Sequence, residues 1–260
     1  MMIVAEEMLE QKDIMTNKVK GQILSAIKMA PILADAPFPC FTVDRLFDWN
    51  FYHQLIKNLP SKEEYVQTRA ERTSNQFAYE SRTKIALTDQ DQLARIDPQK
   101  KQIWQELAGF FQSDHFITTL FMKYKPFLKE RYGDALRFEP KVRLELIRDC
   151  TGYRINPHTD ATHKIFTSLI YLPKQLTDLD LGTSIYRHEN PDFRCEAGGQ
   201  YDPMKQSFHE IFRAPYQPGR MFSFMKTDNS FHGREPIERE NVERNLMICT
   251  VQHGQAFIGS

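Results

Sequence analysis

The sequence predicts a mainly β fold, a jelly roll or β-sandwich that packs against amino-terminal helices. In the first half, apolar residues recur at three- and four-residue steps, as in amphipathic helices. From about residue 140 onward they instead form many short runs separated by turn residues. Helices followed by a series of short strands are the order expected for a helical scaffold on a layered β core.

The composition agrees with a β-rich interior and gives no sign of a polyanion-binding surface. Hydrophobic residues make up 41% of the chain and aromatic residues 12%, which suits strands packed in a core. Lys+Arg and Asp+Glu both number 34, so the net charge is zero and no nucleic-acid partner is expected. A homodimer is left open as a partner arrangement.

The chain shows no membrane or secretory signal. Its amino terminus becomes acidic early, and no apolar run approaches the ~20 residues of a membrane span. The four cysteines are widely spaced, which favours free thiols in a reducing compartment: Cys40, Cys150, Cys195 and Cys249. We therefore expect a soluble, cytoplasmic protein without a membrane partner.

The first elements in chain order are helices. Apolar periodicity predicts a helix over residues 3–30, which Pro31 ends. Residues 36–43 predict a Pro-rich turn and a short strand. A second helix is expected to begin at Asp44 or Asp48, either of which could be its N-cap.

The middle of the chain predicts a connection and then more helix. Residues 61–84 are polar and charged, which indicates a surface loop or a lid over a site. Residues 98–132 carry a continuous apolar stripe and predict one or two core helices, ended by Gly133.

The second half predicts strands and one long insertion. Alternation or short apolar runs predict β-strands over residues 142–147, 166–172, 182–186, 220–224 and 244–252. Residues 187–217 are polar and irregular and predict a long, functional loop. We expect a single domain over 1–260, with a helical scaffold over 1–135 and the β core over 136–260.

A metal site is predicted by His158-Thr159-Asp160. Side chains alternate along a strand, so His158 and Asp160 face the same way. An imidazole and a carboxylate on one face are two thirds of the facial triad that holds non-haem Fe(II) and leaves positions open. His232, far away in sequence, is the candidate for the third ligand.

Arg244 follows His232 by twelve residues and enters an apolar strand. Burying a guanidinium there is unfavourable unless it has an anionic partner. A 2-oxo acid that chelates iron would supply one, because its distal carboxylate can accept two parallel hydrogen bonds from an arginine. The alternative is a surface ion pair with Glu243 or Glu240.

These residues, with Tyr171-Leu172-Pro173, Gly182–Tyr186, Pro218-Gly219-Arg220 and Phe231-His232-Gly233, resemble the Fe(II)/2-oxoglutarate-dependent dioxygenases. The resemblance covers roughly residues 140–255. It implies a double-stranded β-helix, a cupin-like jelly roll, packed on the amino-terminal helices. It also implies that His158, Asp160 and His232 bind Fe(II), that Arg244 holds the 2-oxoglutarate carboxylate, and that O2 is consumed.

The chain departs from the family at one position. Many members carry Ser or Thr two residues after the arginine, where this chain has Leu246. Tyr153 or Tyr171 is a candidate for the missing hydroxyl. Asn156 shares the face of His158 and could contact cosubstrate or substrate, or make a structural hydrogen bond.

Two arginines are candidates for substrate binding. Arg154 shares the parity of His158 and could reach an anionic group. Arg234 could hold a substrate carboxylate or only a nearby glutamate. His163 has an odd offset from His158, so we expect it on the surface rather than at the metal.

The resemblance implies an enzyme that hydroxylates, or otherwise oxidises, an unactivated C–H bond of a small molecule such as an amino acid or biosynthetic intermediate. Succinate and CO2 would be released. Related halogenases have a small residue in place of Asp160, so hydroxylation is favoured over halogenation. The alternatives are a non-catalytic module that senses metal or 2-oxoglutarate, and a hydroxylase of protein side chains.

Overall fold

The computed structural model describes residues 13–67, 81–133, 139–175, 179–198 and 207–254. Its strands form two antiparallel sheets. The larger sheet has seven strands in the order β1-β9-β6-β11-β4-β3-β2, and the smaller has four in the order β5-β10-β7-β8. The mainly β, jelly-roll-like fold predicted from the sequence is confirmed.

The strands of the larger sheet come from both halves of the chain. Their bounds are β1 Cys40–Val43, β2 Val66–Gln67, β3 Arg82–Ala86, β4 Pro140–Cys150, β6 Lys164–Tyr171, β9 Met221–Met225 and β11 Glu243–His253. The smaller sheet contains β5 Ile155–His158, β7 Thr183–His188, β8 Phe208–Ala214 and β10 His232–Arg234. The division into a scaffold over 1–135 and a core over 136–260 remains a prediction, although β1, β2 and β3 belong to the larger sheet.

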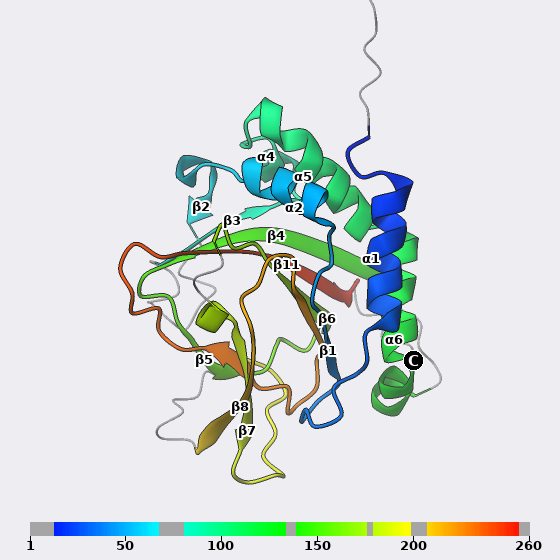
Figure 1. Cartoon of the computed structure of the whole chain (residues 1–260). Helices are drawn as coiled ribbons and strands as arrows, with labels where there is room; N and C mark the ends of the chain where they lie inside the picture. The colour runs from blue at the N-terminus through cyan, green and yellow to red at the C-terminus, as the bar shows by residue number, and fades with distance from the viewer. Residues whose placement is uncertain (1–12, 68–80, 134–138, 176–178, 199–206, 255–260) are drawn as a thin grey trace, which may run out of the picture.

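The helices lie over one face of the larger sheet, and the smaller sheet lies on its other side (Figure 1). Their bounds are α1 Asn17–Met29, α2 Trp49–Lys57, α4 Gln90–Leu93, α5 Pro98–Phe111 and α6 Asp114–Tyr132, with short 3-10 turns η1 Lys62–Glu64 and η3 Leu179–Leu181. Among the described helices, none combines the length and apolar character that crossing a bilayer requires.

Strand alternation divides the apolar residues between two cores. On β11, Met247 and Cys249 pack against the helices, whereas Leu246 faces the space between the sheets. On β4, Leu146 faces the helices and Ile147 faces the smaller sheet. The same alternation directs Arg244 and Asp149 inward, between the sheets.

The helix predictions are confirmed with adjusted ends. α1 begins only at Asn17, where the Thr16 hydroxyl accepts a hydrogen bond from a backbone N–H, and residues 1–12 lie outside the described part. α2 has Asp48 rather than Asp44 as its N-cap. Asp44 instead pairs with Arg220 at 2.9 Å. All four cysteines are free thiols, as predicted.

The prediction of a loop over residues 61–84 is wrong in two places, the first being residues 66–67, which form β2 and pair with β3. Residues 82–84 belong to β3, which pairs with β4. The charged residues of this segment resemble those of a loop because their partners lie on the neighbouring strand and not nearby in the sequence. Lys84 binds Glu145 at 2.9 Å, and Arg82 binds Asp149 at 2.6 Å. Residues 68–80 lie outside the described part.

The prediction of an irregular insertion over residues 187–217 is also wrong in part. Residues 208–214 form β8, which pairs with β7 at the edge of the smaller sheet. Several β8 side chains are exposed, and Arg213 forms ion pairs with Glu210 and Glu235, so apolar alternation is weak there. Residues 199–206 lie outside the described part.

Candidate metal centre

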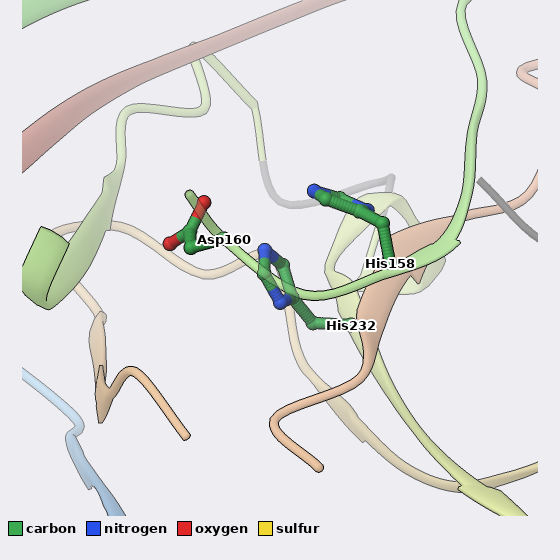
Figure 2. A group of neighbouring side chains, drawn as sticks. All are labelled: His158, Asp160 and His232. Atoms are coloured by element: carbon green, nitrogen blue, oxygen red, sulfur yellow. The ribbon is translucent and has the colours of Figure 1, made fainter. Parts of the chain in front are cut away.

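Three predicted metal ligands come together on the smaller sheet. β5 and β10 are adjacent antiparallel strands, and their register places His158 opposite His232. Asp160 follows two residues after the end of β5. One ligand atom from each of the three lies within 4.8 Å of the others, and the side chains point toward a common centre (Figure 2).

Backbone carbonyls fix the orientation of both imidazoles. Nδ1 of His158 is 2.9 Å from the carbonyl oxygen of Asn156, and Nδ1 of His232 is 2.9 Å from that of Ser230. A carbonyl only accepts, so each Nδ1 carries the hydrogen. The Nε2 lone pairs are therefore available for a cation, and the tautomers are set before any metal binds.

The charge states of the triad suit a divalent cation. Burial, followed by the neighbouring His232, lowers the pKa of His158 to about 3, and burial also lowers the pKa of His232. Burial alone would raise the pKa of Asp160, but the Lys164 ammonium and the two imidazoles outweigh it and hold the pKa below its usual range. Two neutral imidazoles and one carboxylate are the donors that non-haem Fe(II) takes.

Two side chains from β6 hold the Asp160 carboxylate. The Thr167 hydroxyl donates to Oδ2 at 2.6 Å, and the Lys164 ammonium lies 2.5 Å from Oδ1. Sequence reasoning did not identify either residue. Lys164 is four residues after Asp160, but its approach depends on the turn between β5 and β6, which the sequence pattern does not specify.

A cavity of about 140 Å³ opens beside the triad. One end carries the triad with Lys164 and Thr167, and the wall includes Ile155, Leu169 and Ile248. The other end is cationic and hydroxylic, lined by Arg82, Tyr153, Thr183, Arg234 and Arg244. The space can hold one small molecule with a metal-binding group at one end and an anionic group at the other.

Arg244 reaches the cationic end of this cavity from β11. Its side chain is 2% exposed. Nε donates to the Leu181 carbonyl at 2.5 Å, Nη1 to Asp149 at 2.7 Å and Nη2 to the Thr183 hydroxyl at 3.2 Å. Three of the five guanidinium N–H donors are thus used, and two are left, the number that a bidentate carboxylate takes.

Asp149 is the internal partner of Arg244, in place of the surface glutamates considered from the sequence. Arg82 approaches the same carboxylate with Nε at 2.6 Å and Nη2 at 2.9 Å, and its guanidinium lies 4.1 Å from the ring centroid of Tyr153. Sequence reasoning missed both Arg82 and Asp149. The alternation of side chains along β4 could have identified Asp149, because it places Asp149 on the same face of the strand as Glu145 and Ile147.

The other predicted site residues divide into two groups. Tyr153 and Arg234 line the cavity, and Arg234 is 5% exposed. Tyr171, Asn156 and Arg154 are not among the described lining residues. The Tyr171 hydroxyl accepts the backbone N–H of Thr183 at 3.0 Å, and Asn156 contributes its carbonyl to His158.

Comparisons with known proteins rest on structure alone. No family model and no curated protein matches the sequence. A prolyl-4-hydroxylase from Pseudomonas putida superposes with a TM-score of 0.50 at 12% identity, over 89% of this chain and 99% of that one. The shared fold confirms the predicted resemblance at the level of architecture.

Two further solved structures are similar at lower scores. A prolyl 4-hydroxylase from Phytophthora capsici gives a TM-score of 0.49 at 14% identity and covers 92% of this chain, which spans 65% of that protein. A 2OG-Fe(II) oxygenase family protein from Burkholderia pseudomallei gives 0.46 at 8% identity, over 91% of each chain. Of these three structures, two are named prolyl 4-hydroxylases and one is named a 2OG-Fe(II) oxygenase.

Proposed function

We propose that this chain is an Fe(II)- and 2-oxoglutarate-dependent oxygenase that hydroxylates, or otherwise oxidises, an unactivated C–H bond of a small molecule. The observation that supports it best is one cavity with the His158, Asp160 and His232 triad at one end and Arg244 at the other. A 2-oxo diacid has the matching groups: an oxo acid that chelates a metal and a distal carboxylate that pairs with a guanidinium.

When bound, iron and 2-oxoglutarate supply the oxidising chemistry, with O2 as oxidant and with succinate and CO2 as co-products. The chain's own residues orient and shield that chemistry. The triad leaves one side open toward the cavity, while Ile155, Leu169 and Ile248 form an apolar wall that excludes water. Thr167 holds the Asp160 carboxylate in place at 2.6 Å.

Thr183 supplies the hydroxyl that Leu246 lacks. Its Oγ1 accepts from Arg244, so its own hydrogen is free to be donated to a carboxylate beside that arginine. Tyr153 lines the same end and offers a second hydroxyl. Tyr171 does not contact the carboxylate itself but positions Thr183, because its hydroxyl accepts a hydrogen bond from the Thr183 backbone N–H.

The direct test is turnover of 2-oxoglutarate. Protein loaded anaerobically with Fe(II) and then exposed to O2 should convert 2-oxoglutarate to succinate, slowly alone and faster with its substrate. Libraries of amino acids and biosynthetic intermediates are the first candidates. Protein that takes up Fe(II) but neither binds nor consumes 2-oxoglutarate would contradict the proposal.

Two alternatives have different signatures in the same assay. A non-catalytic sensor would bind metal and 2-oxoglutarate and produce no succinate with any substrate. A protein side-chain hydroxylase, the activity that the name of the P. putida structure indicates for that protein, would respond to proline-containing peptides rather than to free metabolites. Peptides therefore belong in the substrate panel.

A further inference from the structure

The cationic end of the cavity brings three guanidinium groups together. Arg82, Arg234 and Arg244 line it, and among the described residues Asp149 forms ion pairs with Arg82 and Arg244. Asp149 pairs with Arg244 at 2.7 Å, and Arg234 is not among its partners. Like charges gathered out of water are unfavourable unless an anion joins them.

Arg234 is the guanidinium without a partner. No described residue forms a hydrogen bond or ion pair with its side chain, and its Nε is buried and unsatisfied. The two acids whose charges act on Arg234 form their ion pairs with other arginines: Glu235 with Arg213 at 2.6 Å, and Asp180 with Arg239 at 2.8 Å. Burial, followed by the neighbouring Arg244, lowers the pKa of Arg234 to about 10, which still leaves it charged at neutral pH.

The position of Arg234 places it beside Arg244 rather than outside the cavity. It is two residues after His232 on β10, so both side chains face the cavity. Tyr153 lies close to Arg82, Arg244 and Arg234, whose charges all oppose the rise in its pKa that burial causes. The cavity is continuous from the triad to this cluster and has room for one small ligand.

We propose that Arg234 and Arg244 together bind the distal carboxylate of 2-oxoglutarate, so that a second arginine is added to the arginine and hydroxyl that the family resemblance implies. This inference rests on the proposed function. It assigns Arg234 to binding of the cosubstrate, whereas the sequence made it a candidate for binding the substrate. The paired guanidinium groups make this end selective for 2-oxo acids with a second carboxylate, because a neutral end group would leave both cations in a dry site.

The test measures binding without turnover. Mn(II)-loaded protein, kept anaerobic, is titrated calorimetrically with 2-oxoglutarate and with 2-oxovalerate, which has a methyl group where 2-oxoglutarate has its distal carboxylate. Arg234→Met should weaken 2-oxoglutarate binding by about tenfold to a hundredfold, the usual effect of losing a hydrogen bond to a charged group. Binding of 2-oxovalerate should change by less than about threefold.

Two further variants make the result specific. Arg143→Met removes an arginine that pairs with Glu145 away from the cavity, and should change neither affinity. Arg234→Lys keeps the charge but not the planar fork, so it should lose part of the 2-oxoglutarate affinity alone. If the Arg234→Met variant fails to fold, the Arg234→Lys variant is used in its place.

The outcomes separate this inference from the proposed function. If wild-type protein binds 2-oxoglutarate and the Arg234 variants bind it equally well, the inference is overturned and Arg234 is left to an anionic substrate. If the Arg234 variants bind both 2-oxo acids more weakly by the same factor, the inference is also overturned, because the substitution would then affect the oxo-acid group at the metal rather than the distal carboxylate. If wild-type protein binds Mn(II) but binds neither 2-oxo acid, the proposed function itself is contradicted.

Discussion

Oδ2 of Asp149 accepts a hydrogen bond from Nη1 of Arg244 at 2.7 Å, and the two side chains are 0% and 2% exposed. The same carboxylate accepts hydrogen bonds from both Nε and Nη2 of Arg82. Asp149 therefore joins β3, β4 and β11 at the cationic end of the cavity and fixes the direction in which Arg244 points.

Asp149→Asn should destabilise the fold strongly. Without the carboxylate charge, the buried guanidinium of Arg244 loses its anionic partner, and breaking a buried ion pair in this way costs about 3–5 kcal/mol. Urea unfolding measures the difference. Asp180→Asn is the matched control, since its pair with Arg239 is exposed on both sides and should contribute under about 1 kcal/mol. Equal effects of the two substitutions would contradict the role given to Asp149.

His158→Ala should abolish tight metal binding. It removes one of three ligands whose Nε2 is directed at the centre, so the loss should exceed the ~10–100-fold that removal of an outer contact causes. Equilibrium binding of Mn(II) or anaerobic Fe(II) gives the affinity. His163→Ala, at an exposed position outside the triad, should bind metal as wild type does. Retention of metal by the His158 variant would argue that the cation binds elsewhere.

Thr167→Val should weaken the metal site without removing a ligand. The Thr167 hydroxyl donates to Asp160 at 2.6 Å in a buried environment, and valine has nearly the same shape but no donor. We expect metal affinity to fall by about 10–100-fold. Thr250→Val is the matched control, because Thr250 lies directly across from Thr167 on β11 and is also buried. If both variants lose affinity equally, the effect comes from packing rather than from the hydrogen bond to Asp160.

The triad was predictable because its geometry follows from local rules. His158 and Asp160 are two residues apart in extended chain, so their common face needs only strand alternation. The inward direction of Arg244 follows from the same alternation along an apolar strand. Pairing of β5 with β10 within the smaller sheet then brings His232 opposite His158, a step that the sequence order suggests and the register settles.

The remainder of the site depends on long-range pairing that no local pattern encodes. Arg82 lies in a polar stretch that reads as a loop, and it becomes part of the site only because β3 pairs with β4 and places it opposite Asp149. Lys164 reaches Asp160 through the turn between β5 and β6. The unpartnered state of Arg234 is visible only once Glu235 and Asp180 are seen to bind other arginines.

Gly233→Ala should disturb the metal centre through the backbone. Gly233 lies between His232 and Arg234 on β10, and an added Cβ would come within 2.5 Å of the Ile155 carbonyl oxygen on β5. Strand separation must then increase where His158 faces His232, so we expect a stability loss of about 1–3 kcal/mol together with weaker metal binding.

Gly109→Ala is the matched control for that substitution, because a Cβ at this position of α5 meets nothing within 4 Å. It should leave metal affinity unchanged and raise stability by about 0.5–1 kcal/mol, since alanine favours the helix over glycine. Urea unfolding and Mn(II) titration of both variants give the comparison. A Gly233 variant with wild-type metal affinity would show that β5 and β10 can separate without moving the ligands, and that the triad does not depend on their close pairing.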